Sequence, residues 1–374
     1  MAGIYIHIPF CKQACHYCDF HFSTNQSYVA QMTAAICDEI KLQRNYLERE
    51  VIDTVYFGGG TPSLLSQGQV DQILNTLAKY HNINENAEIS FEANPDDLDL
   101  KKLGELSESG INRLSIGIQS FSEDVLKFLN RAHNRDQALN SIHWAREAGF
   151  ENISIDLIYG ISINNHIGWK SDLKTILEIK PEHISSYCLT IEPQTVFGHR
   201  AKKGQFPKQD EEFEAEQYDM LISQLISAGY LHYEVSNFCL PEKYSRHNSN
   251  YWKQKKYLGL GPGAHSYNMT ERQFNVSHNH KYMSSIQEGT VPADFEVLTL
   301  EEKINEYILT TIRTIWGCDL SYLKDKHGYD LYSRKYSYLN DLISNKFAML
   351  EGTSLKLTEE GLLLADEISS ALFV

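Results

Sequence analysis

The first half of the chain alternates short apolar segments with longer segments in which apolar residues recur at helical spacing. This alternation is typical of a parallel sheet whose strands are joined by right-handed helical crossovers. The pattern predicts six strands, at residues 4–8, 54–57, 88–93, 113–117, 152–157 and 183–189. It predicts helices between them at 27–46, 67–79, 100–109, 135–148 and 169–179.

Six strand–helix units without a clear seventh predict an α/β fold, a partial (β/α)6 barrel of the TIM type that stays open. In such barrels the functional residues gather at the C-terminal ends of the strands. We expect the barrel to occupy residues 1–195 and a connecting region to occupy 196–297. Apolar residues at helical spacing, interrupted by turns, predict a mainly helical, winged-helix-like domain at 298–374.

Composition narrows the function classes. At 374 residues the chain can form one large and one smaller domain, and a formal charge of −15 argues against binding nucleic acid. No apolar stretch approaches the ~20 residues of a membrane-spanning helix, which leaves only peripheral association with a membrane. Seven cysteines without a framework of pairs suit a reducing compartment, so we expect a cytoplasmic protein.

Three of these cysteines, Cys11, Cys15 and Cys18, follow the first predicted strand with the spacing C-x3-C-x2-C. Three thiolates can hold a [4Fe–4S] cluster by three irons and leave the fourth iron open to another ligand, whereas four cysteines suit electron transfer. The spacing therefore favours an enzyme, or a descendant of one, over a ferredoxin.

Zinc is the alternative for such a triplet. Structural zinc sites usually join two ligand pairs across a longer loop, which a single tight triplet does not provide. A fourth zinc ligand would have to come from a nearby histidine, and the candidates are His7, His16 and His21.

A glycine run, Gly58-Gly59-Gly60-Thr61-Pro62, follows the second predicted strand. Such a run either forms a tight turn or offers backbone amides to a polar ligand. With the cysteine spacing, it resembles the radical S-adenosylmethionine (SAM) superfamily. The resemblance implies that the cysteine loop holds a [4Fe–4S] cluster and that Gly59, Gly60 and Thr61 receive the methionyl amino group of SAM.

Four further polar residues lie at or after the ends of the later strands: Glu92, Gln119, Arg131 and Asp156. A carboxylate can bind hydroxyl or amino groups and an arginine suits a carboxylate, although any one of them alone could be a surface charge or a buried strut. Their order and spacing are similar to the porphyrin-related branch of the superfamily, the HemN/HemW group. The resemblance implies that these residues and Tyr5 contact SAM.

Two features divide the members of that group. Coproporphyrinogen dehydrogenases typically carry a fourth cysteine, C-x3-C-x2-C-x-C, where this chain has Phe20. The run from His247 to Trp252 matches the H-N-x-x-Y-W pattern of the heme chaperones, and a Gly-rich loop at 257–266 follows it. Because histidine is a usual axial ligand of heme iron, the resemblance implies heme contact at His247, with His265 as a second candidate. The other reading is that His247 caps a turn and Trp252 fills the core.

The resemblance thus implies a heme chaperone that binds heme and passes it to apo-proteins of the respiratory chain, with the cluster and SAM assisting or gating the transfer. The alternative is a radical enzyme acting on a porphyrin, in which one electron from the cluster cleaves SAM to methionine and a 5′-deoxyadenosyl radical. A third class, an iron–sulfur scaffold without catalysis, is disfavoured by the glycine run and the polar strand ends. The sequence leaves open whether the protein is a monomer or a homodimer.

Overall fold

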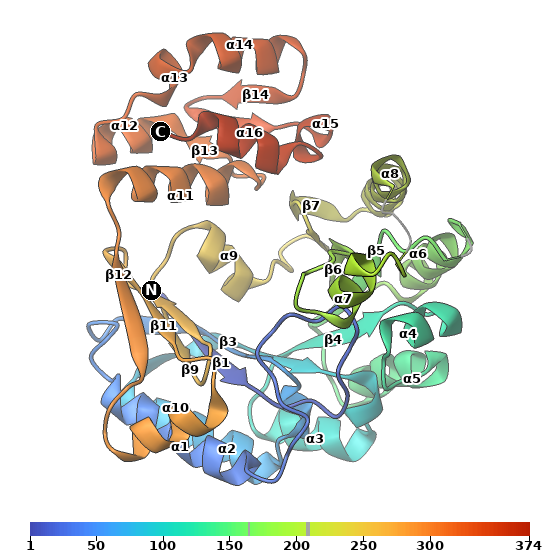
Figure 1. The fold of residues 1–374 in the computed structure, drawn as a ribbon, viewed down its shortest axis with the longest axis vertical. Coiled ribbons are helices and arrows are strands. Elements are labelled where there is room, and N and C mark those ends of the chain that lie inside the picture. The colour runs from blue at the N-terminus through green and yellow to red at the C-terminus, as the bar shows by residue number, and fades with distance from the viewer. Residues whose placement is uncertain (164, 207–209) are drawn as a thin grey trace.

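The computed structural model describes residues 1–163, 165–206 and 210–374, and in these a twelve-stranded sheet dominates the fold (Figure 1). Its centre consists of six adjacent parallel strands in sequence order, as the pattern of apolar segments predicts. These strands are β1 (Ala2–Ile8), β2 (Val51–Gly59), β3 (Asn82–Ala93), β4 (Arg113–Gln119), β5 (Ile153–Tyr159) and β6 (His183–Cys188).

Helices join successive strands and cover the outer face of the sheet (Figure 1). Five of them lie where the sequence predicts helix: α1 (Val29–Leu42), α2 (Gln67–Tyr80), α3 (Leu100–Glu108), α5 (Arg135–Glu147) and α6 (Ile167–Ile179). Three shorter elements have no counterpart in the prediction because they are too short for a helical period to emerge. They are η1 (Pro62–Leu64), η2 (Pro95–Asp97) and α4 (Glu123–Leu129).

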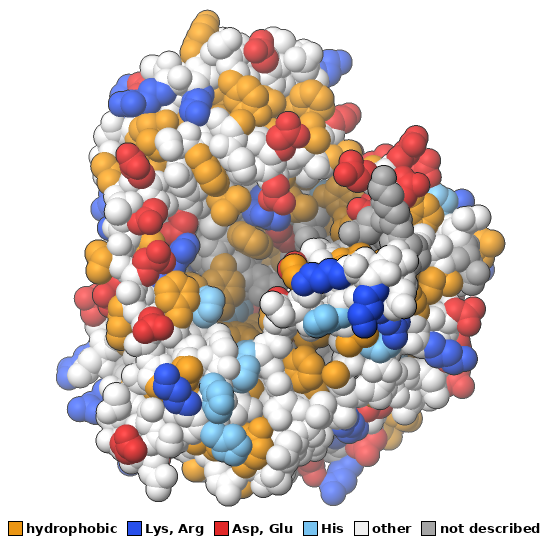
Figure 2. Space-filling view, in the orientation of Figure 1, with side chains coloured by type: hydrophobic (Ala, Val, Ile, Leu, Met, Phe, Trp, Pro, Cys, Tyr) orange, Lys and Arg blue, Asp and Glu red, His pale blue; other side chains and the backbone are white. Residues whose placement is uncertain are grey.

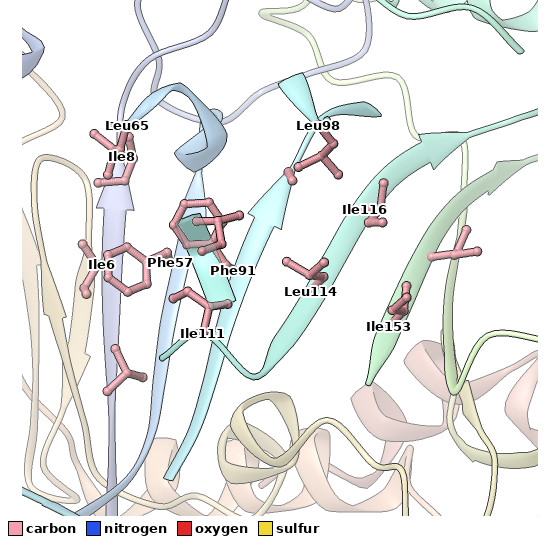
Figure 3. Close-up of a cluster of buried hydrophobic side chains, with 14 of the residues drawn as sticks. Ile6, Ile8, Phe57, Leu65, Phe91, Leu98, Ile111, Leu114, Ile116 and Ile153 are labelled. Atoms are coloured by element: carbon pink, nitrogen blue, oxygen red, sulfur yellow. The ribbon is translucent and has the colours of Figure 1, made fainter. Parts of the chain in front are cut away.

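The two faces of the central strands differ in chemistry. Successive side chains of a strand point to opposite faces, and in β1 the residues Ile4, Ile6 and Ile8 are almost fully buried. They pack on the outer face beneath the helices, where apolar side chains of β2 to β5 continue the same layer (Figure 3). Tyr5 and His7 alternate with these isoleucines, so β1 presents polar groups to the inner face.

The sheet extends beyond the six parallel strands on both sides. One edge carries β9 (Tyr257–Leu260), which pairs parallel with β1, then β10 (His265–Tyr267), β11 (Glu271–Asn275) and β12 (Ala293–Val297). The other edge carries β8 (Asn237–Cys239) and β7 (Leu231–Glu234). Within the described residues β12 and β7 remain the two edges, so the barrel is open, as predicted. The sheet continues through the region 196–297, so this region extends the barrel as well as connecting it to the next domain.

Four helices accompany these outer strands: α7 (Val196–Lys202), α8 (Glu211–Ser227), α9 (Arg246–Trp252) and α10 (Asn279–Gln287). Helix α9 lies against the inner face of the sheet and contacts β1, β2 and β3. Its His247 is close to Gly3, since a Cβ atom added to Gly3 would lie 3.3 Å from the imidazole ring. Helix α9 therefore covers the N-terminal half of the barrel interior.

The C-terminal region forms a smaller, mainly helical unit with its own apolar core. The hairpin of β14 and β15 follows four helices, which agrees with the predicted mainly helical, winged-helix-like domain. Its elements are α11 (Leu300–Ile312), β13 (Cys318–Asp319), α12 (Leu320–His327), α13 (Leu331–Arg334), α14 (Tyr336–Ser344), β14 (Ala348–Glu351), β15 (Ser354–Leu357), α15 (Glu359–Leu362) and α16 (Ala365–Leu372). Across the described parts of the chain, no helix has the length and apolar character needed to cross a membrane.

Candidate cluster and cofactor site

The cysteine loop leaves the C-terminal end of β1 and is closed at its base by backbone hydrogen bonds. The amide of Cys11 donates to the carbonyl of Ser23 over 3.1 Å, and the amide of Ser23 donates to the carbonyl of Pro9 over 2.9 Å. In the middle of the loop, the amide of His16 donates to the carbonyl of Leu129 over 3.0 Å. The loop is thus held both at its own ends and by the C-terminal end of α4.

Two of the cysteine sulfurs are joined by a chain of side-chain hydrogen bonds. The Thr61 hydroxyl donates to Cys11 Sγ over 3.4 Å and accepts from Asn94 Nδ2 over 3.2 Å. Arg131 donates through Nη2 to Asn94 Oδ1 over 2.6 Å and through Nη1 to Cys15 Sγ over 3.2 Å. The glycine run, the end of β3 and the segment after α4 therefore meet at the cysteine loop.

The glycine run lies too close to β1 for any larger residue. A Cβ atom at Gly59, where φ is +102°, would lie 2.4 Å from the ring of His7, and one at Gly60 would lie 2.6 Å from the carbonyl oxygen of Phe10. The Gly60 amide donates to the carbonyl of Ile8 over 2.9 Å, so this amide is not free for a ligand. The glycines therefore permit close approach of two chain segments, in addition to any contact with a cofactor.

The three thiols lie in a partly buried environment. Burial raises the pKa of Cys11 to about 11 and that of Cys18 to about 12. The free thiols of Cys11 and Cys18 are thus protonated at neutral pH, and binding to iron must displace those two protons. Among the described residues, no three Cys, His, Asp or Glu side chains converge on one point as a single metal ion requires. A cubane cluster binds each thiolate through a different iron, so three cysteines can hold it without converging on one metal ion.

The histidines that could complete a zinc site are already engaged. Both ring nitrogens of His7 have partners, the Tyr5 hydroxyl at 3.1 Å and the carbonyl oxygen of His21 at 2.8 Å. One ring nitrogen of His16 and one of His21 also lie within hydrogen-bond distance of other groups, the carbonyl of Phe128 and the side chain of Asn279. His7 and His21 join the two ends of the cysteine loop, and His16 joins the middle of the loop to α4.

Acidic side chains line the barrel interior next to the cysteine loop. Glu92 accepts a hydrogen bond from the Tyr56 hydroxyl over 2.8 Å, and the ring of Tyr56 stacks on that of Tyr5 at 6.2 Å. Burial, reinforced by the charge of Asp156, raises the pKa of Glu92 to about 7. Burial raises the pKa of Asp156 to about 6, although Ser115 donates a hydrogen bond to it over 3.1 Å. Such carboxyls become fully ionised most readily when a cation binds beside them.

Gln119 and Arg131 meet on either side of Gly117. A Cβ atom on Gly117 would lie 3.1 Å from Gln119 Nε2 and 3.3 Å from Arg131 Nη2, and the Gly117 carbonyl accepts from that same nitrogen over 2.8 Å. The Nε atom of Arg131 is buried and has no hydrogen-bond partner. An unpaired buried guanidinium donor is costly unless a ligand satisfies it, so the site fits an anionic group such as the carboxylate of SAM.

The predicted SAM ligands thus converge around the mouth of the barrel, and the three cysteines adjoin them. They are Tyr5, Gly59, Gly60, Thr61, Glu92, Gln119, Arg131 and Asp156. The contacts of each of these residues with SAM stay a prediction, because they rest on the family pattern. The sequence reasoning missed Asn94 and Tyr56, which join the predicted residues. Their positions, directly after and near the ends of predicted strands, are the signal that could have found them.

His247 lies elsewhere. Its side chain is buried, with 2% exposed, and its Nδ1 and Nε2 atoms are each 2.8 Å from a hydroxyl oxygen, of Thr54 and Tyr251 respectively. Its ring stacks on Tyr56 at 5.0 Å, on the side away from the cysteine loop. Heme contact at His247 stays a prediction. In this structure both of its ring nitrogens have hydroxyl partners, and its ring packs on Tyr56, which donates to Glu92.

Comparisons with known proteins identify the family of this chain. The model of the radical SAM superfamily matches residues 5–174. The chain is 35% identical over 384 residues to the heme chaperone HemW of Bacillus subtilis (strain 168), covering 99% of each protein. It is 33% identical over 364 residues to the heme chaperone HemW of Lactococcus lactis subsp. lactis (strain IL1403), covering 97% of this chain and 95% of that protein.

A solved structure has the same fold over the whole chain. The coproporphyrinogen III oxidase HemN of Escherichia coli, a radical SAM enzyme, superposes with a TM-score of 0.86 at 22% identity, covering 100% of this chain and 90% of that one. The fold and the cysteine site define a radical SAM protein with an open barrel. The chain belongs to the HemW family within the radical SAM superfamily, and membership of that superfamily implies a [4Fe–4S] cluster and SAM.

Proposed function

We propose that this protein is a heme chaperone, which binds heme and passes it to apo-proteins of the respiratory chain in the cytoplasm or at the membrane surface. The observation that carries the proposal is the full-length similarity to two proteins named as heme chaperones, at 35% and 33% identity. A [4Fe–4S] cluster on Cys11, Cys15 and Cys18 and a bound SAM assist or gate the transfer.

The cysteine loop supports this proposal over the oxidase. The position at which the oxidases typically carry a fourth cysteine is Phe20, whose side chain is 69% exposed. An exposed phenylalanine cannot bind a metal, but it offers a flat apolar surface beside the cluster loop, of the kind that a macrocycle can contact.

The chain's own residues have defined tasks in this function. Arg131 and Asn94 hold the cysteine loop, and the buried Nε of Arg131 can donate a hydrogen bond to an anionic ligand. Glu92 and Asp156 supply negative charge opposite a cationic cofactor, and Tyr56 orients Glu92. SAM, when bound beside a reduced cluster, supplies radical chemistry.

The experiment is an anaerobic titration of the reconstituted protein with heme, followed by its Soret absorbance, and then by mixing with an apo-cytochrome. We expect saturable binding near one heme per chain and transfer of that heme to the acceptor. Absence of saturable binding would contradict the proposal.

The second candidate is a radical enzyme that acts on a porphyrin. It is favoured by the assembly of carboxyl, amide and guanidinium groups around the cysteine loop, which a heme carrier alone does not need. The test is to incubate the reduced protein with SAM and coproporphyrinogen and to measure 5′-deoxyadenosine. Stoichiometric release that depends on the porphyrin would support the enzyme and overturn the chaperone as the main function.

A further inference from the structure

If the protein binds heme, the iron needs an axial ligand that the structure leaves free, and His247 is not free. The described histidine that best meets this requirement is His265, at the start of β10. Its side chain is exposed, and no hydrogen bond engages either of its ring nitrogens. We propose that His265 is the axial ligand of the heme iron, and that the heme lies on the rim formed by the Gly-rich loop 259–265 and the cysteine loop. This inference rests on the proposed function.

The Gly-rich loop holds His265 at the edge of the cofactor site. Strand β9 pairs with β1, and Gly259 lies opposite Tyr5 in this pairing. A Cβ atom at Gly259 would lie 2.1 Å from the carbonyl oxygen of His265. A Cβ atom at Gly261, where φ is +101°, would lie 2.5 Å from the carbonyl oxygen of His7. Only glycine allows these approaches, so the loop fixes His265 relative to β1.

The cysteine loop reaches the same rim. A Cβ atom at Gly263 would lie 3.3 Å from the Cβ atom of His21, which directly follows the exposed Phe20. His265 is also close enough to His7 to contribute to the lowered pKa of His7, which is about 4 mainly because of burial. An iron porphyrin bound at His265 would therefore lie next to the cluster loop and next to Tyr5 and His7.

The immediate surroundings of His265 suit a macrocycle. Phe274 lies opposite His265 in the register of β10 and β11, and the two rings are 4.7 Å apart with an angle of 80° between their planes. An axial imidazole stands nearly perpendicular to the porphyrin that it binds. The Phe274 ring can therefore lie flat beside that porphyrin. Partial desolvation beside β11 and the nearby charge of Arg272 lower the pKa of His265, which favours the neutral form that binds iron.

The surface view is consistent with this position. Figure 2 shows several histidine side chains together on one face, at the margin of a hollow that is partly lined with hydrophobic side chains. Two further exposed histidines have ring neighbours of their own: the rings of His278 and His280 are 6.4 Å apart, and the ring of His280 lies 5.1 Å from that of Tyr28. They provide internal controls, because they are exposed but lie on α10 or directly before it, outside β10 and the Gly-rich loop.

The test compares three variants of the full, cluster-loaded chain: His265→Ala, His280→Ala and His247→Phe. Each is titrated with hemin and examined by Soret absorbance and by electron paramagnetic resonance of the ferric heme. We expect His265→Ala to change the Soret and electron paramagnetic resonance spectra, which together form the ligand signature of the heme iron. Heme affinity should fall by at least roughly tenfold, the loss that removal of even an outer-shell partner causes at a metal site. Added imidazole should restore the signature, and the other two variants should keep the signature of the unaltered protein.

The outcomes separate this inference from the function on which it rests. If the unaltered protein binds no heme, the proposed function fails. If it binds heme and His265→Ala keeps the same signature and affinity, the function stands and His265 is not the ligand. If His247→Phe alone loses the signature while retaining its cluster and its unfolding temperature, the ligand is His247 and the inference is overturned.

Discussion

Arg131 joins two parts of the site: its Nη1 donates to Cys15 Sγ over 3.2 Å, while its Nη2 donates to Asn94 Oδ1 over 2.6 Å. Through Asn94 and Thr61 the same chain of hydrogen bonds reaches Cys11. The positions of two cysteines are therefore set by residues that come from three different strand-to-helix connections. Any account of the cluster must include these supporting groups as well as the thiols.

Replacement of Cys11, Cys15 or Cys18 with alanine should abolish the brown absorption of the reconstituted protein, because each thiolate binds one iron. Iron and sulfide content and the visible spectrum measure the result. Cys37→Ala is the matched control, since that thiol is buried in α1 and away from the loop. A full cluster in any of the three variants would exclude its cysteine as a ligand.

Asn94→Ala should weaken SAM binding by roughly 10- to 100-fold, because a hydrogen bond to a charged group typically contributes about 1.5–3 kcal/mol and Arg131 would lose its orientation. Calorimetric titration of the cluster-loaded protein with SAM measures this. Asn86→Ala, on an exposed part of β3, should leave the affinity unchanged. Equal SAM affinities of the Asn94 variant and the unaltered protein would show that the hydrogen bond from Arg131 to Asn94 does not position the guanidinium.

Glu92→Gln should stabilise the cofactor-free protein at high pH. Burial raises the folded pKa of Glu92 from 4.5 to about 7, so the folded state binds more protons than the unfolded state between those values. Stability therefore falls as the pH rises through this window, and the penalty is fully present above it. We expect the variant to gain roughly 1–3 kcal/mol in unfolding free energy at about pH 8 and little at about pH 4.5.

The same replacement should weaken SAM binding, because the ionised carboxyl faces a cationic cofactor. Denaturant unfolding at two pH values and SAM titration in the same buffers measure the two effects. A gain in stability that is equal at both pH values would show that the ionisation of Glu92 does not cause the pH dependence of the unfolding free energy. Asp124→Asn, at an exposed position in the first turn of α4, serves as the control.

His247→Ala should lower the unfolding free energy by about 1–3 kcal/mol, because it removes two buried hydrogen bonds and leaves a space under Tyr56. Its heme spectrum should be that of the unaltered protein. His143→Ala, on the exposed face of α5, should change neither property. A variant with full stability and altered heme absorbance would support the heme contact at His247 that its motif predicts.

Much of the fold could be predicted from the sequence, for identifiable reasons. The six parallel strands have β-rich apolar runs, and each is followed by a segment of helical period, so local pattern is enough to place them. The pairing of β9 with β1 was not predictable in this way, because it joins residues about 250 positions apart and depends on the final topology. The polar inner face of β1 was visible only as an alternation of isoleucine with Tyr5 and His7.

The site was predictable in part for a different reason. Cys11, Glu92 and Arg131 belong to spacings that a motif preserves. A motif shows which residues occur together in a sequence, but it does not show on which side of the sheet or helix each side chain lies. That is why His247 was predicted as a ligand although the structure places it beneath Tyr56, whereas Asn94 was overlooked although it bonds to Arg131.

Helix α9 covers the N-terminal half of the barrel interior, and its far end meets the C-terminal domain, where Arg313 lies 5.2 Å from the ring centre of Trp252. Because His247 and Trp252 belong to the same short helix, α9 links the C-terminal domain to Tyr56 and, through its hydroxyl, to Glu92. A change in the C-terminal domain that shifts α9 would therefore alter the surroundings of the Glu92 carboxyl.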